Sequence, residues 1–221
     1  MSHRVHPYAH RLGIIRGWKS RWFGMGKKYR EHLMSDTMVR KFITKKLTGM
    51  YVSLVEIERG QKNIRIIIKT SRPGLVIGRN GEGSEKLRND IVKFMNKNKL
   101  NPENIEIKLD IEEIHSPESD AQIVAQQVKE ALEKRMPFRR VLKQTVEKVM
   151  ANRDVKGVRV KMGGRLNGAD MARNEELRKG RVPLQTFRAD IDFARTRATI
   201  PQGDIGVKVW IYRGEIFEND K

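Results

Sequence analysis

The chain has 221 residues, of which 38% are hydrophobic and 33% are charged, and its formal net charge is +19. This length supplies a hydrophobic core for one large domain or two small ones. The longest apolar runs, such as Ile66-Ile67-Ile68, are far too short to span a bilayer, and no apolar segment typical of an exported protein begins the chain. The absence of cysteine excludes disulfides, thiolate nucleophiles and thiolate metal sites.

The positive charge is unevenly distributed. Counting Lys and Arg against Asp and Glu, residues 1–50 carry a net charge of +10, residues 51–118 carry +1 and residues 119–221 carry +8. Two basic flanks enclosing a nearly neutral middle indicate a polyanionic partner, with nucleic acid favoured over an acidic membrane surface. The sequence contains neither a basic amphipathic helix nor a lipidation signal, either of which would favour a membrane.

Residues 1–35 are predicted to form an extended basic N-terminal arm with a short helix near its end, because basic, aromatic and glycine residues mix there without periodicity. Trp18, Trp22 and Phe23 stand among arginines and lysines. Aromatic rings in such surroundings can stack on bases, or they can pack against the protein's own body. Both alternatives stay open at this point.

Residues 36–116 are predicted to fold as an α+β domain, in which a three-stranded sheet carries helices on one face. Ser35-Asp36 can cap the first helix, and the strands are indicated by alternation of apolar with polar residues. The predicted elements are a helix to about residue 47, strands near 55–58, 64–69 and 105–111, and two helices around a loop at 78–81.

That loop, Gly78-Arg79-Asn80-Gly81, is the most informative motif in the chain. An amphipathic helix follows it, and the two glycines allow another backbone to approach without meeting a Cβ. The N–H groups at the start of the second helix favour an anion, which is how a KH domain clamps a nucleic-acid backbone. The alternative is a plain helix–turn–helix corner. The spacing matches neither the dinucleotide GxGxxG nor the GxxxxGK[ST] loop of nucleotide hydrolases.

Residues 117–214 are predicted to form a second α+β domain, followed by a short tail at 215–221. Ser116-Pro117 suits the start of a helix, and Pro137 separates it from the next one. The predicted elements are helices to about 136 and over 138–150, strands near 158–162, 190–193 and 207–212, and a short helix over 170–178.

Several cations in this domain share a face. Arg139, Arg140 and Lys143 are three or four residues apart on one helix, so they form a cationic patch that suits phosphate contacts or is simply solvated. Arg159 and Lys161 share a strand face. The basic residues predicted to contact RNA are Arg4, Arg11, Lys19, Arg21, Lys27, Lys28, Arg159, Lys161 and Arg165.

No catalytic constellation is recognised. His3, His6 and His10 invite a metal site, but basic neighbours disfavour a cation and no acidic ligand is close. We therefore expect no catalytic residues, no cofactor and no metal. The alternatives from other classes are a nucleic-acid lyase or nuclease, tested by activity on abasic or single-stranded substrate, and a free KH-type RNA-binding regulator.

Six ordered blocks resemble the family of bacterial-type small-subunit ribosomal protein S-three. They are Val5-His6-Pro7 with Arg11-Leu12-Gly13, the stretch 72–82, Phe138-Arg139-Arg140, the stretch 164–169, the stretch 180–192 and the stretch 205–215. The resemblance implies a type II KH domain, a family-specific C-terminal domain and a cytoplasmic, ribosome-bound protein. It implies contacts with ribosomal RNA in the subunit head and with ribosomal proteins S-ten and S-fourteen. It also implies that Arg139, Arg140 and Lys143 face incoming messenger RNA and help to open its helices without nucleotide hydrolysis.

Overall fold

The computed structural model describes residues 5–60, 63–98, 100 and 106–217, and it divides the chain into two compact units. One unit consists of residues 18–115; the other joins the residues up to 17 with those from 116 onward. The first 35 residues, predicted as one arm, are thus shared between the two units. None of the helices in the described part is long and apolar enough to cross a membrane.

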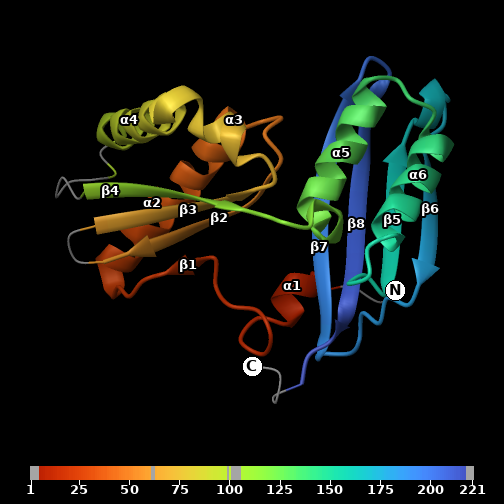
Figure 1. The fold of residues 1–221 in the computed structure, drawn as a ribbon, viewed down its shortest axis with the longest axis horizontal. Coiled ribbons are helices and arrows are strands. Elements are labelled where there is room, and N and C mark those ends of the chain that lie inside the picture. Colours follow the sequence, from red (N-terminus) through yellow and green to blue (C-terminus); the bar gives the residue numbers. More distant parts are fainter. Residues whose placement is uncertain (1–4, 61–62, 99, 101–105, 218–221) are drawn as a thin grey trace. The chain divides into compact units, whose positions relative to one another are not determined.

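The unit of residues 18–115 is a four-stranded sheet with helices on one face (Figure 1). Its strand order is β1-β2-β3-β4, in which β2 and β3 are antiparallel and the other two pairs are parallel. The elements are β1 (Ser20–Arg21), α2 (Gly26–Lys46), β2 (Val52–Arg59), β3 (Asn63–Thr70), α3 (Pro73–Ile77), η1 (Arg79–Gly81), α4 (Glu82–Lys97) and β4 (Glu106–Glu113).

The core of this unit forms because apolar residues recur at helical spacing in α2 and α4 and at alternate positions in the strands. Ile43 of α2, Ile91 of α4 and Ile66 of β3 are fully buried in one cluster. The rings of Phe42 and Phe94 stack with their centroids 4.5 Å apart, which joins α2 to α4. This part of the fold agrees with the predicted KH-type domain, except that β1, from the predicted arm, adds a fourth strand to the expected three.

Helix α2 begins at Gly26, about ten residues before the predicted start, and the prediction that Ser35 and Asp36 cap it is wrong because both lie inside the helix. Instead, the Asp36 carboxylate lies on the buried side of the helix, where it accepts hydrogen bonds from Trp22 Nε1 at 2.7 Å and from Arg59 Nε at 2.7 Å. The pair Asp36–Arg59 is nearly inaccessible to solvent. It ties the segment before α2 and the end of β2 to the helix.

The second unit is a four-stranded antiparallel sheet of order β6-β5-β8-β7, with α5 and α6 packed on one face (Figure 1). Its elements are α1 (Pro7–His10), η2 (Pro117–Ser119), α5 (Ala121–Glu133), α6 (Phe138–Met150), β5 (Gly157–Gly164), η3 (Leu166–Gly168), β6 (Arg173–Gly180), β7 (Ala189–Ile200) and β8 (Gly203–Glu215). Val160, Met162 and Val209 of the sheet are fully buried beneath the two helices.

Two predictions for this unit are wrong in detail. The short helix expected over 170–178 is the edge strand β6, which pairs along its length with β5 and buries part of Leu177 against the core. The helix expected from residue 117 begins at Ala121, because Asp120 caps it there: its Oδ1 accepts from the N–H groups of Gln122 at 2.9 Å and Ile123 at 3.0 Å.

Candidate nucleic-acid interface

The GxxG loop is a tight, exposed turn between α3 and α4. Gly78 and Gly81 have φ angles of 72° and 85°, and Asn80 has a φ of 50°. A Cβ at Gly78 would lie 3.0 Å from the backbone nitrogen of Gly83, so this position requires glycine both for its conformation and for the close approach. Arg79 and Asn80 are exposed at the tip. The loop therefore presents backbone and two polar side chains to solvent, as a KH loop must.

Gly83, which sequence reasoning overlooked, is as constrained as the two loop glycines. A Cβ there would lie 2.7 Å from the carbonyl oxygen of Val76 and 2.8 Å from that of Ile77, so only glycine lets α4 start against the end of α3. Glu82 and Glu85 occupy the first turn of α4, where carboxylates complement the helix dipole and oppose a phosphate. The loop is thus shaped for a nucleic-acid backbone but only weakly attractive to it.

A cavity of about 340 Å³ lies between α4 and β4. Two of its lining residues are cationic, Arg88 and Lys108, and three are acidic: Glu85, Glu106 and Asp110. On the face of the sheet away from the helices, cations are paired in the same way: Arg21 contacts Glu58 at 3.1 Å and Lys69 contacts Glu112 at 3.2 Å. Many cations on the KH sheet and around this cavity therefore have acidic neighbours within the same unit.

The cationic patch on α6, defined as Arg139, Arg140 and Lys143, is exposed in the first two turns of the helix. The Arg139 guanidinium lies 5.7 Å from the centroid of the Phe138 ring, whereas Arg140 and Lys143 form no ion pair with any described residue. Each cation near a helix N-terminus costs about 0.3–1 kcal/mol against the helix dipole. The three cations therefore destabilise the start of α6 slightly, and the binding of an external anion there would be favourable.

A second cationic surface lies on the sheet face away from α5 and α6. The register places Lys161 of β5 opposite Lys208 of β8, and Lys208 opposite Arg195 of β7. Residues directly opposite each other point to the same face, so these three form a row across three strands, which we call the cationic row. None of the three is ion-paired within the described residues. Lys208 was missed in the sequence, although its alternation with Val207 and Val209 was visible there.

Beside the cationic row, Arg159 is less available than predicted. Its guanidinium lies 5.1 Å from the Trp210 ring centroid and donates to Glu176 at 2.6 Å, and its side chain is 14% exposed. Arg165 is also engaged: its Nε donates to the carbonyl oxygen of Ala169 at 2.9 Å and its Nη1 to that of Gln202 at 3.3 Å. The structure therefore gives these two arginines intramolecular partners.

The prediction that Arg11 binds RNA is wrong. Arg11 is fully buried, and burial lowers the pKa of its guanidinium. Its nitrogens donate to five backbone carbonyl oxygens, those of Ala189 at 2.6 Å, Thr186 at 2.8 Å, Pro7 at 3.0 Å, Leu184 at 3.1 Å and Pro183 at 3.4 Å. Arg11 thus joins the N-terminal segment of the second unit to residues 183–189 of the same unit, and no phosphate can reach it.

The other predicted residues of the arm have varied surroundings. Arg21 pairs with Glu56 and Glu58, Lys27 lies 3.9 Å from Glu31, and Lys28 is exposed at the start of α2. Lys19 is exposed, while Arg4 and His3 lie outside the described residues. The aromatic residues of the arm also differ in their surroundings. The ring centroids of Trp22 and Tyr29 lie 5.3 Å apart, so Trp22 packs against the protein, whereas Trp18 and Phe23 are 68% and 86% exposed.

The two units match two known domain families. Residues 38–119 match the KH domain, and residues 128–211 match the ribosomal protein S3 C-terminal domain. A small ribosomal subunit protein uS3 from Methylococcus capsulatus is 45% identical over 218 residues, which cover 99% of this chain and 94% of that protein. The chain belongs to the uS3 family of small ribosomal subunit proteins.

Other uS3 relatives are similar over the same extent. The protein from Clostridium beijerinckii is 40% identical over 221 residues, covering 100% of this chain and 96% of its own length. That from Caldicellulosiruptor saccharolyticus is 44% identical over 216 residues, with coverages of 98% and 94%. The resemblance predicted from the six sequence blocks is confirmed. As a uS3 family member, the chain is a structural protein of the small ribosomal subunit and is ribosome-bound.

Proposed function

We propose that the chain binds ribosomal RNA in the head of the small subunit and lines the channel through which messenger RNA enters. In this proposal, the cationic row and the start of α2, with Lys27 and Lys28, hold ribosomal RNA. The cationic patch on α6 faces the messenger. The single observation that carries the proposal is the patch itself, three exposed cations on the first turns of α6 with no acidic residue in the first turn.

The chemistry of both surfaces favours phosphate over base contacts. Lysine and arginine on rigid elements neutralise phosphates irrespective of sequence, which suits a channel that must pass any messenger. Cations held along a single strand also favour that strand over its paired form, since they stabilise the separated backbone. This is a passive contribution to the opening of messenger helices and requires no nucleotide hydrolysis.

The GxxG loop contributes less to RNA binding than the basic surfaces do. The acidic residues in the first turn of α4 and the mixed charges of the α4–β4 cavity weaken its attraction for a polyanion. We therefore assign Gly78, Arg79, Asn80 and Gly81 a secondary contact with RNA and place the stronger contacts on the basic surfaces of α2, α6 and the cationic row.

We also propose ribosomal proteins S-ten and S-fourteen, with other head proteins, as neighbours on cytoplasmic ribosomes. An exposed apolar stripe supports a protein contact: Met25, Tyr29 and Leu33 are four residues apart at the start of α2 and are 75%, 49% and 47% exposed. Gradient sedimentation of the tagged chain tests its association, because a free KH-type regulator would separate from ribosomal subunits at physiological salt.

The channel proposal is tested by replacing the patch. Arg139→Ala with Arg140→Ala and Lys143→Ala should leave subunit assembly intact and slow translation through a messenger hairpin in a reconstituted system. The matched control removes the same charge from α4 by Lys86→Ala, Lys93→Ala and Lys97→Ala, residues that are exposed on the other unit. Normal transit through hairpins by the α6 variant would refute the channel role. The lyase or nuclease alternative is tested separately by incubating the purified chain with abasic and single-stranded substrates.

A further inference from the structure

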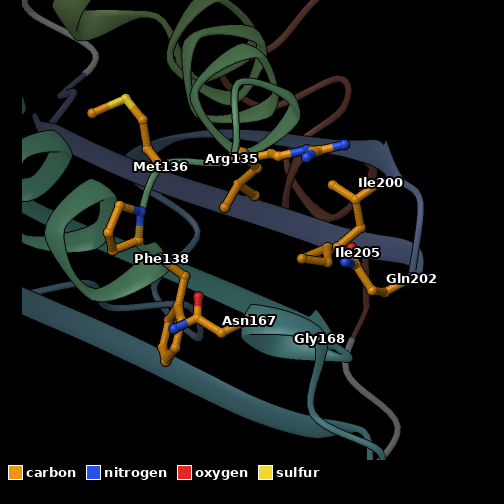
Figure 2. A pocket seen from close by; sticks show the side chains of 10 residues that line it. Arg135, Met136, Phe138, Asn167, Gly168, Ile200, Gln202 and Ile205 are labelled. Atoms are coloured by element: carbon orange, nitrogen blue, oxygen red, sulfur yellow. The ribbon is translucent and has the colours of Figure 1, made fainter.

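A cavity of about 300 Å³ lies within the second unit, beside the first turn of α6 (Figure 2). It forms where the end of α5, the start of α6, the η3 turn and the β7–β8 turn meet. Figure 2 shows Met136 and Phe138 on one side, with Asn167 on the η3 turn, Ile200 at the end of β7 and Gln202 on the β7–β8 turn around it. The cavity is therefore adjacent to the cationic patch on α6.

The walls and the rim of this cavity differ in chemistry. Phe138 and Ile205 are buried and Met136 and Ile200 are half-buried, so the walls are apolar. Asn167, Gln202 and Arg135 are exposed at the rim. Among the residues that the structure describes, the side chains of these three make no hydrogen bond or ion pair. Each amide thus offers both a free donor and a free acceptor.

The backbone at the rim is held in an unusual conformation. Arg135 and Asn167 have φ angles of 59° and 56°. Only four non-glycine residues of the described part have a positive φ, and one of the other two is Asn80 of the GxxG loop. Non-glycine residues in the left-handed region concentrate at functional sites, because surrounding structure must maintain them. Two of the four border this one cavity.

Arg165 maintains the positions of the two amides. Its guanidinium donates to the carbonyl oxygen of Ala169, just after the η3 turn, and to that of Gln202 on the β7–β8 turn. It also lies 3.2 Å from Asp170 Oδ1. By joining the two turns, Arg165 holds Asn167 and Gln202 together at the rim of the cavity, where the Gln202 side chain lies against Gly168. The residue predicted to bind RNA directly is thus a positioning residue for this site.

We propose that this cavity takes an unstacked nucleobase of the single-stranded RNA that passes along α6. The apolar walls contact the faces of the base, the two amides bind its hydrogen-bonding edge and Arg135 contacts an adjoining phosphate. A nucleobase combines flat apolar faces with an edge of donors and acceptors, and proteins recognise single-stranded RNA by this combination. The inference rests on the proposed RNA contact of the α6 patch and adds a base contact to it.

The test compares two ligands with equal charge, a uridine dodecamer and a dodecamer of abasic ribonucleotides, binding to the full chain. Asn167→Gly with Gln202→Ala removes both amides, and glycine tolerates the left-handed conformation at position 167. The variant should bind the uridine dodecamer about 5- to 20-fold more weakly and the abasic dodecamer unchanged, with the same salt dependence. Gln144→Ala removes an exposed amide from α6 outside the cavity and serves as the control.

Gln202→Ala alone, in an exposed turn, keeps the test valid if the double variant is poorly folded. It should reduce the preference for the base-bearing ligand about 3- to 5-fold. An unchanged preference in both variants, with salt-dependent binding retained, would overturn the base site and leave the phosphate function intact. Absence of salt-dependent binding to either dodecamer would refute both.

Discussion

Replacing Arg11 by methionine should destabilise the second unit severely, although the residue was expected to bind RNA. The substitution keeps much of the side-chain volume and removes five hydrogen bonds to carbonyl oxygens that come from residues 7 and 183–189. Hydrogen bonds from a charged donor contribute about 1.5–3 kcal/mol each, and the cost of removing the guanidinium from water, several kcal/mol, offsets part of their sum. The net loss in the free energy of unfolding is about 3–5 kcal/mol.

A loss of that size should lower the melting temperature of the second unit by about 10–20 °C, as measured by calorimetry of the full chain. The melting temperature of the Arg11→Lys chain should lie between those of the wild type and the Arg11→Met chain, because an ammonium has three donors where the guanidinium has five. Lys28→Met, which removes an exposed cation, should leave the melting temperature unchanged and weaken RNA binding slightly. An Arg11→Met chain with the wild-type melting temperature and a smaller salt dependence of RNA binding would refute the structural role.

Two further predictions concern the RNA surface and the KH unit. If the chain neutralises about ten phosphates, the log–log slope of RNA affinity against salt should be roughly −7 to −9, and alanine at Lys161, Lys208 and Arg195 should reduce its magnitude by about 2–3. A slope near zero for the wild type, or no change in the variant, would exclude these contacts. Gly83→Ala should destabilise the unit of residues 18–115 by about 1–3 kcal/mol in chemical unfolding, because its Cβ would lie 2.7 Å from the carbonyl oxygen of Val76. A Gly83→Ala chain with the wild-type free energy of unfolding would contradict this prediction, because it would show that α3 and α4 can move apart without loss of stability.

Periodicity in the sequence predicted most of the fold, because burial of one face imposes a repeat that is visible locally. The strands on either side of the GxxG loop and the helices α5 and α6 lie near where that repeat placed them. The edge strand β6 was taken for a helix because only one of its residues, Leu177, packs against the core and the rest of the strand is polar. An exposed edge carries no strong pattern of its own.

The sequence predicted those parts of the candidate site that charged residues at regular spacing define. It did not predict the parts whose residues are brought together only by the tertiary structure. The α6 patch follows from the spacing of its cations along a helix. Arg11 resembles any other basic residue in the first segment, since its carbonyl partners lie 172–178 residues away except for one at residue 7. The rim of the cavity beside α6 joins residues 135, 167 and 202, and no local pattern connects them.

The separation between Arg11 and its partners also sets the order in which the chain can fold during its own synthesis. The unit of residues 18–115 is continuous, so it can form as soon as its last strand has left the ribosome. The second unit begins with α1 but needs β7 and β8, so the segment around Arg11 has no place to dock until nearly the whole chain is made. Docking of this basic segment therefore follows the synthesis of residues 183–189 and is a late event in folding.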